Sequence, residues 1–64
     1  MRIIKLAEVK ARTGEGHSTI YEKIREGTFP RQVRTGKRSV GWIDEEIDQY
    51  IRSKIAERDA AVGA

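Results

Sequence analysis

The sequence predicts a small, mostly α-helical fold with one β-hairpin, in the order helix, turn, helix, two-stranded wing and C-terminal helix. Two short amphipathic stretches, 6–13 and 18–26, flank a glycine-rich break. A basic segment of alternating polar and apolar residues, 31–42, follows a Gly-Thr-Phe-Pro sequence that stops the second helix. A longer apolar stripe then runs through 43–55. This order is typical of a winged helix-turn-helix, whose usual activity is binding duplex DNA.

The composition excludes several classes of protein. The 64 residues leave room for one domain with one small core, and a chain this short buries only about 60% of its unfolded surface. There is no cysteine and one histidine, so neither a disulfide framework nor a zinc site is expected. No paired carboxylates suit a catalytic cleft. We therefore expect no metal, no cofactor, no catalytic residues and no enzymatic activity.

The sequence also bears on location. No apolar run approaches the ~20 residues that cross a bilayer. Lys5, Glu8 and Lys10 interrupt the N-terminal region where a signal peptide would be apolar. We expect a cytoplasmic, nucleoid-associated protein with no membrane partner.

Charge is distributed unevenly along the chain. Residues 1–42 hold ten Lys/Arg and four Asp/Glu, a net +6, whereas residues 43–64 hold three Lys/Arg and six Asp/Glu, a net −3. A basic N-terminal part and an acidic C-terminal part can orient a protein on a polyanion. Ordinary surface charge is the alternative, so the inference of nucleic-acid binding depends on the helix pattern as well.

The first helix is predicted from Leu6 and Val9, which lie three residues apart on one narrow apolar face. Ile3 and Ile4 precede it as a short extended segment. Gly14 should end the helix in a left-handed conformation. The short turn that follows would set the second helix at a steep angle to the first.

The second helix starts at His17 or Ser18, and a serine there can cap the free N–H groups of the first turn or bind a phosphate. Ile20 and Ile24 share the face that enters the core. The polar side chains on the other faces are free to enter a major groove. Gly27 should stop the helix, and Pro30 prevents its continuation.

Two side chains of this helix have two interpretations each. Tyr21 covers the edge of the core or contacts DNA. Glu22 accepts a hydrogen bond from cytosine N4 or pairs with Arg25 on the surface.

The segment 31–42 is predicted to form the wing, with Val33, Val40 and Trp42 facing inward and a turn around Gly36. Its basic tip suits contact with the DNA backbone or minor groove, and a solvated loop is the alternative. Gly41 indicates a bulge or the close approach of another backbone.

The C-terminal helix begins at Asp44, which can act as its cap. Ile47, Tyr50, Ile51 and Ile55 form its apolar stripe, and the distal end near Ile55 is expected to be exposed or paired with another copy. We expect a DNA-binding domain over 1–58 and a frayed tail over 59–64.

Several runs in this order resemble the AlpA family of prophage regulatory proteins, which is related to excisionase and MerR-type winged helix-turn-helix domains. The resemblance covers roughly residues 2–55. It rests on Arg2–Val9, Thr13-Gly14, Ser18–Tyr21, Ile24–Pro30, Arg38–Trp42 and Glu46-Ile47.

The resemblance implies a bacterial, phage or integrative-element protein that binds double-stranded DNA and regulates transcription. The implied DNA-binding residues lie on the second helix and the wing: Ser18, Thr19, Tyr21, Glu22, Lys23, Arg25, Arg34, Lys37, Arg38 and Ser39. An excision factor that bends attachment-site DNA is the close alternative. A protein-interaction adaptor using the C-terminal helix is an alternative of another class. A domain this small makes few base contacts, so we expect a homodimer or a cooperative array on DNA. An integrase or RNA polymerase is a further candidate partner.

Overall fold

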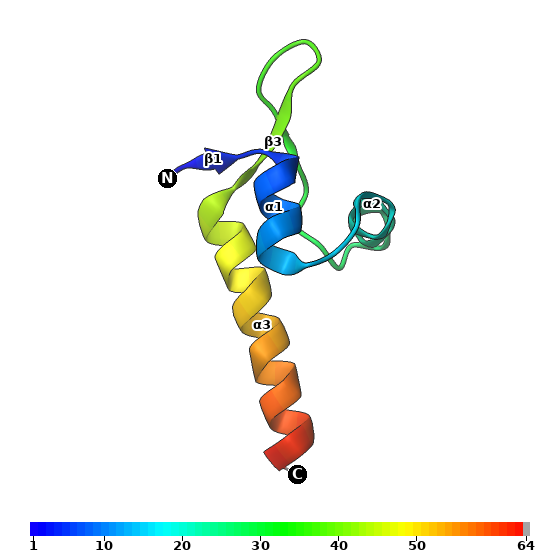
Figure 1. The fold of residues 1–64 in the computed structure, drawn as a ribbon, viewed down its shortest axis with the longest axis vertical. Coiled ribbons are helices and arrows are strands. Elements are labelled where there is room, and N and C mark those ends of the chain that lie inside the picture. The colour runs from blue at the N-terminus through cyan, green and yellow to red at the C-terminus, as the bar shows by residue number, and fades with distance from the viewer. Residues whose placement is uncertain (64) are drawn as a thin grey trace.

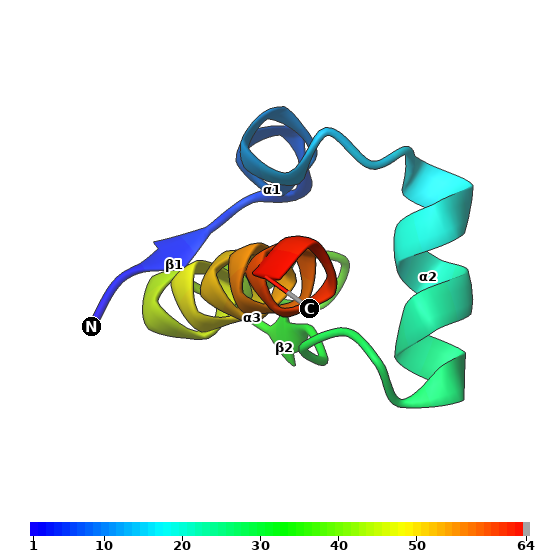
Figure 2. The same ribbon diagram turned by 90° about the horizontal axis from the view of Figure 1, so that it is seen from below.

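The computed structural model describes residues 1–63. Three helices and a small antiparallel sheet form the molecule, which confirms the predicted fold class. The elements follow in the order β1 (Ile3–Ile4), α1 (Leu6–Thr13), α2 (His17–Glu26), β2 (Val33–Arg34), β3 (Val40–Ile43) and α3 (Asp44–Gly63). Figures 1 and 2 show α1 and α3 running alongside one another, with α2 lying across them at the edge of the molecule.

The sheet has the strand order β1-β3-β2, with both neighbouring pairs antiparallel. The predicted hairpin is therefore present as β2 and β3. The extended segment Ile3–Ile4 adds a third strand on the other side of β3, a pairing that the sequence did not predict. A Cβ atom added to Gly41 would lie 3.0 Å from the carbonyl oxygen of Ile4 and would collide with the side chain of Ile3. Gly41 thus allows the close approach of β1, as expected for that glycine.

The register of the hairpin corrects one prediction for the wing. Val33 pairs with Gly41, and Arg34 pairs with Val40. Directly paired residues share one face of a sheet, and successive residues alternate between faces. Val33 therefore lies on the face opposite to Val40 and Trp42, and it is exposed. Trp42 is fully buried, as predicted, and Val40 packs against the core.

The core draws one or more apolar side chains from every helix, from two strands and from the linker after α2. Its buried members are Ile4, Val9, Ile20, Phe29, Trp42, Ile47 and Tyr50. The indole Nε1 of Trp42 donates to the carbonyl oxygen of Pro30 at 3.1 Å, and the rings of Phe29 and Tyr50 are 4.5 Å apart. These contacts attach the linker after α2 to both the sheet and α3.

The ends of α1 and α2 follow the predicted glycine stops. Gly14 has φ 71° and Gly27 has φ 82°, a left-handed conformation that costs glycine little. The start of α2 differs from one prediction, because Gly16 and not Ser18 occupies the N-cap position, with an extended backbone. The carbonyl oxygen of Gly16 accepts the N–H of Ile20 at 3.0 Å. Ser18 is already inside the helix, so its side chain cannot serve as the cap.

The last helix extends well beyond the body. Its side chains are buried or half-buried only as far as Ile51, and residues 52–61 are exposed, including Ile55 at 44%. This projection gives the molecule its extents of 47 × 24 × 19 Å, and Figure 1 shows it pointing away from the sheet. The predicted boundary at 58 falls inside α3, and the division into a domain and a tail stays a prediction.

Among the helices that the structure describes, none is long and apolar enough to cross a membrane.

Candidate nucleic-acid interface

The outward face of α2 is set by the burial of Ile20, which is fully covered by the core. Of the predicted DNA-binding residues on this helix, Ser18, Thr19, Glu22 and Arg25 are exposed. At about 100° per residue, Ser18, Glu22 and Arg25 lie opposite Ile20 and Thr19 lies on the adjoining flank, so together they form a polar surface along α2. Figure 2 shows the helix at the edge of the molecule, with no other element beyond it.

Tyr21 lies between this surface and the core. Its ring is half-buried and meets Trp42 edge-on, with ring centroids 6.2 Å apart and an angle of 68° between the planes. Its other neighbour is the His17 ring, at 4.9 Å. The edge-on contact is a favourable aromatic geometry. Tyr21 therefore covers the edge of the core, which is one of its two predicted roles.

Glu22 has no ion-pair partner within the described part of the chain, so the surface pair with Arg25 is absent. The Glu22 carboxylate is exposed on the outward face of α2. A free carboxylate on a surface that faces DNA is repelled by phosphate and can accept a hydrogen bond from an amino group of a base.

Lys23 points inward, toward α3. Its Nζ atom donates to Oε1 of Glu15, in the turn before α2, and to the hydroxyl of Tyr50 at 3.1 Å. The Tyr50 hydroxyl in turn donates to Oε2 of Glu15 at 2.7 Å. The three side chains form a closed ring of hydrogen bonds, which we call the Glu15–Lys23–Tyr50 ring. It joins the inter-helix turn, α2 and α3.

The ring determines the charge states of its members. Partial burial by itself would raise the pKa of Glu15, but hydrogen bonds from Lys23 and Tyr50 outweigh it and hold that pKa below its ordinary value. The hydrogen bond to Glu15, supported by the one to Tyr50, raises the pKa of Lys23. Burial and the bond to Glu15 raise the pKa of Tyr50. At neutral pH the ring therefore contains one carboxylate, one ammonium and a neutral phenol.

The wing presents the other predicted DNA-binding residues. Arg34 is on β2, and Lys37, Arg38 and Ser39 are in the loop that connects β2 to β3. All four side chains are exposed. The loop is closed by a hydrogen bond from the N–H of Thr35 to the carbonyl oxygen of Ser39 at 2.9 Å. Figure 1 shows it projecting from the end of the molecule opposite to the free end of α3.

Ion pairs separate the basic residues into two groups. Every basic residue of α3, together with Arg2, Arg12 and Lys23, lies within 4.0 Å of a carboxylate oxygen. Over the described residues, no such partner occurs for Lys5, Lys10, Arg25, Arg31, Arg34, Lys37 and Arg38. The uncompensated positive charge is therefore concentrated on the linker, the wing and the Lys5–Lys10 region, where a polyanion would be attracted. On α2, Arg25 lies in the same helix as Glu22 and Glu26, which also lack ion-pair partners over the described residues.

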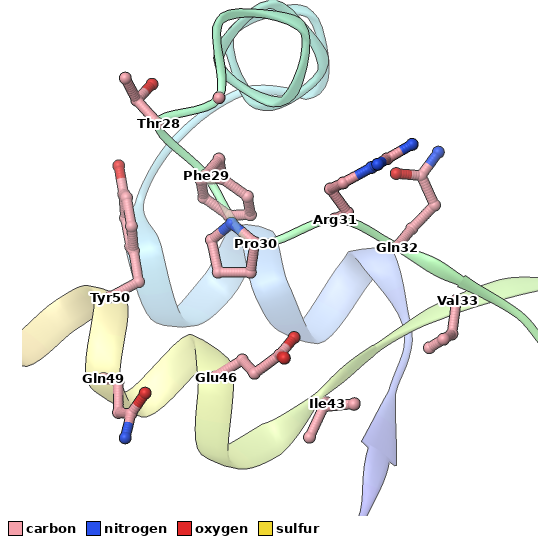
Figure 3. A pocket seen from close by; sticks show the side chains of 11 residues that line it. Thr28, Phe29, Pro30, Arg31, Gln32, Val33, Ile43, Glu46, Gln49 and Tyr50 are labelled. Carbon is pink, nitrogen blue, oxygen red and sulfur yellow. The ribbon is translucent and has the colours of Figure 1, made fainter.

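A groove of about 670 Å³ lies between the segment 27–33 and the start of α3. Figure 3 shows Phe29, Pro30 and Tyr50 along it, with Glu46 on the α3 side. Its charged rim has mixed sign, because Arg31 is on one wall and Glu46 on the other. Over the described residues Glu46 has no ion-pair partner, so a nucleic-acid strand in this groove would meet an uncompensated carboxylate opposite Arg31.

The sequence missed the roles of Glu15 and Tyr50. Tyr50 is separated from Lys23 by 27 residues and from Glu15 by 35, and no local periodicity relates positions so far apart. The described residues contain no cluster of three or more His, Cys, Asp or Glu side chains that could hold a metal ion.

Comparisons with known proteins show the family of this chain. A family model described as prophage CP4-57 regulatory protein (AlpA) matches residues 2–55. The uncharacterized protein ORF88 of Enterobacteria phage P4 is 40% identical over 57 residues, which cover 89% of this chain and 65% of that protein. The DNA-binding transcriptional activator AlpA of Escherichia coli strain K12 is 35% identical over 60 residues, covering 84% of this chain and 86% of the relative. The chain thus spans just under two thirds of the ORF88 protein and most of the E. coli relative.

Proposed function

Because this chain belongs to the AlpA family of prophage regulatory proteins, we propose that it is a sequence-specific DNA-binding regulator of transcription in a prophage or integrative element. Its E. coli relative is described as a DNA-binding transcriptional activator. The target would be double-stranded DNA in the bacterial cytoplasm, at the nucleoid. Operator occupancy that helps or blocks RNA polymerase would be the mechanism.

The observation that carries this proposal is the placement of unpaired positive charge. Arg25 on α2 and Arg34, Lys37 and Arg38 on the wing lack carboxylate partners among the described residues, whereas the basic residues of α3 are paired. Lysine and arginine side chains that neutralise phosphates release counterions, which supplies most of the non-specific affinity for DNA. The wing therefore has three positive charges available for that purpose, and α2 has one, on Arg25.

We expect α2 and the wing to contact different parts of the duplex. Ser18, Thr19 and Arg25 would position α2 in the major groove and contact base edges, with Glu22 accepting from a base amino group. Tyr21, at the border of the core, would reach the backbone. The wing residues Arg34, Lys37, Arg38 and Ser39 would hold the adjacent backbone or minor groove.

Binding of duplex DNA from the genomic neighbourhood of the gene tests the proposal. Fluorescence anisotropy would be measured on native and scrambled duplexes over a salt series. We expect tight binding to one native fragment, weak binding to the scrambled duplex, and affinity that falls as salt rises. Equal, weak binding to both duplexes, or no binding at low salt, would contradict sequence-specific regulation.

Footprinting of the bound fragment separates the regulator from an excision factor. One or two half-sites would fit a regulator that binds as a homodimer. An extended array at an attachment site, with bent DNA, would instead fit a recombination factor that works with an integrase.

A second function is suggested by the free end of α3. Residues 52–61 are exposed and include one large apolar side chain, Ile55. We propose that this end can contact a protein partner, such as RNA polymerase or a second copy. Partner binding that survives neutralisation of Lys37 and Arg38 would support an adaptor role.

A further inference from the structure

We propose that the Glu15–Lys23–Tyr50 ring positions α2 for base reading, and that Lys23 acts through this ring without contacting phosphate. The inference rests on the proposed DNA-binding function and assigns one residue of the expected interface a different role. It also makes Glu15 and Tyr50, which lie outside the outward face of α2, positioning residues for recognition.

The ring is well suited to this role because its hydrogen bonds close on themselves. Both oxygens of Glu15 accept, Lys23 donates twice, and the Tyr50 hydroxyl both accepts and donates. The side chains of Glu15 and Lys23 are only 18% and 30% exposed, and Tyr50 belongs to the core. Partly buried, fully satisfied polar networks of this kind hold their members in one arrangement.

The two ends of α2 are restrained differently. The linker after Gly27 is attached to the body through buried Phe29 and the Pro30 carbonyl oxygen, which accepts from Trp42. The turn before the helix is Gly14-Glu15-Gly16, and there Glu15 bonds to Tyr50 of α3. A single fully buried residue, Ile20, anchors the helix in the core, while Tyr21 and Ile24 pack at the edge. Rotation of α2 about its own axis would carry Lys23 away from Tyr50. The ring therefore restrains the direction in which Ser18, Thr19, Glu22 and Arg25 project.

Contact with phosphate would be costly for Lys23. Its Nζ would have to leave both partners, and the partly buried carboxylate of Glu15 would keep only the Tyr50 hydroxyl as a donor. A buried acceptor that loses its charged partner is destabilised. Arg25, which is exposed and unpaired over the described residues, can reach phosphate at no such cost.

Two conservative substitutions and one control test the role of the ring. Tyr50→Phe removes only the hydroxyl and keeps the aromatic ring in the core. Lys23→Met removes the charge and keeps a long apolar side chain. Lys54→Met is the matched control, since Lys54 lies 5.3 Å from the centroid of the Tyr50 ring but is outside the hydrogen-bonded ring and pairs with Glu57.

DNA affinity would be measured on native and scrambled duplexes over a salt series, at a temperature where circular dichroism shows each variant folded. For Tyr50→Phe and Lys23→Met we expect affinity for the native site to fall roughly tenfold, as losing a charge-assisted hydrogen bond allows. Affinity for scrambled DNA, and the slope of log K against log salt, should stay at the wild-type values. The control should match the wild type on both duplexes.

A loss of about one unit of salt slope in Lys23→Met, with equal weakening on both duplexes, would overturn the inference and make Lys23 a phosphate contact. Unchanged native-site affinity in both ring variants would overturn it as well.

Hydrogen exchange of the free protein provides a readout that does not depend on DNA. In Tyr50→Phe we expect the amides of α2 to exchange several-fold faster, while those of α1 and of 44–51 in α3 keep their wild-type rates. The double variant that combines Tyr50→Phe with Lys23→Met should exchange like either single variant, because the ring fails as a unit. Unchanged exchange of α2 in Tyr50→Phe would refute the positioning role, whatever the DNA measurements show. Wild-type protein that bound native and scrambled DNA equally, with α2 still exchanging faster in Tyr50→Phe, would refute the proposed function alone.

Discussion

At the scale of single residues, Glu15 is the member on which the Glu15–Lys23–Tyr50 ring depends most. Its carboxylate is the ring's one anion, and each oxygen accepts from a different partner. The hydrogen bonds lower its pKa despite the opposing effect of burial. A group whose pKa is depressed by folding stabilises the folded state wherever it is ionised in the unfolded state, and this stabilisation disappears as the pH falls through the folded-state pKa.

The first prediction concerns the pH dependence of stability. Glu15→Gln should lower the free energy of unfolding by about 1–2 kcal/mol at pH 7, because Lys23 and Tyr50 lose a charged acceptor. The difference from wild type should hold above the ordinary carboxyl pKa of 4.5 and shrink as the pH falls below it. Urea unfolding over a pH series measures this, with Glu22→Gln, which removes an exposed carboxylate that has no ion-pair partner over the described residues, as the control. A gap that stays constant down to acidic pH would contradict the assigned role.

At the scale of secondary-structure elements, the sheet depends on a residue without a side chain. β1 crosses β3 so closely at Gly41 that a methyl group there would collide with Ile3 and lie 3.0 Å from the Ile4 carbonyl oxygen. The pairing also brings Ile4 beside Trp42, and both are buried in the core. The N-terminal strand is therefore held by backbone bonds and by burial together.

Gly41→Ala is the second prediction. Displacement of β1 should destabilise the fold by about 1–3 kcal/mol, the usual cost of forcing extra volume into a packed site. Thermal unfolding followed by circular dichroism measures the change. Gly36→Ala is the matched control, because its added methyl would meet Ser39 at an ordinary 3.6 Å. Equal stability of the two variants would show that β1 moves away from β3 without cost.

The third prediction concerns the wing. Replacing Lys37 and Arg38 together by Gln should weaken binding to native and scrambled duplexes alike and lower the salt slope by about two units, one for each lost phosphate contact. The matched control is replacement of Arg52 and Arg58, two cations of α3 that are paired with Asp48 and Asp59. If the two double variants had the same salt slope, the wing would not be a DNA-contacting element.

At the scale of the whole molecule, the body and the free end of α3 differ in how far their side chains are buried. The buried residues end at Tyr50, and the helix continues for three turns without a covering element. Isolated helices of that length are marginal in water. Their side chains add little to the stability of the core, so the free end is available for other contacts.

The fourth prediction follows from this division. A chain that ends after residue 58 should keep the melting temperature of the longer chain within a few degrees, because the described burial ends at Ile51 and residues 59–61 are exposed. Its affinity for one isolated half-site should also be unchanged. Calorimetry and anisotropy measure these two quantities. A large drop in melting temperature would show that the free end of α3 stabilises the body.

Much of the architecture could be predicted because its signals are local. The glycine stops at Gly14 and Gly27, the extended Ile3–Ile4 segment and the buried Trp42 all appear in the structure as expected. The family assignment predicted from the sequence motifs is confirmed by the match over residues 2–55. The predicted DNA contacts remain predictions, although Ser18, Thr19, Glu22, Arg25 and the wing residues are exposed as such contacts require.

The sequence by itself determined the elements, their order and the family, because periodicity, glycine and proline act on neighbouring residues. Tertiary structure decided which strands pair, which face Val33 occupies and where Lys23 points. A shift of one residue in the register of a strand moves every side chain to the opposite face of the sheet. Strands of two residues, such as β2, contain too few side chains to fix the register from the sequence pattern. The partners of Lys23 come from α3 and from the turn before α2, which only the packed fold brings together. Burial of Ile20 and Tyr50 therefore determines which polar side chains remain free to meet DNA.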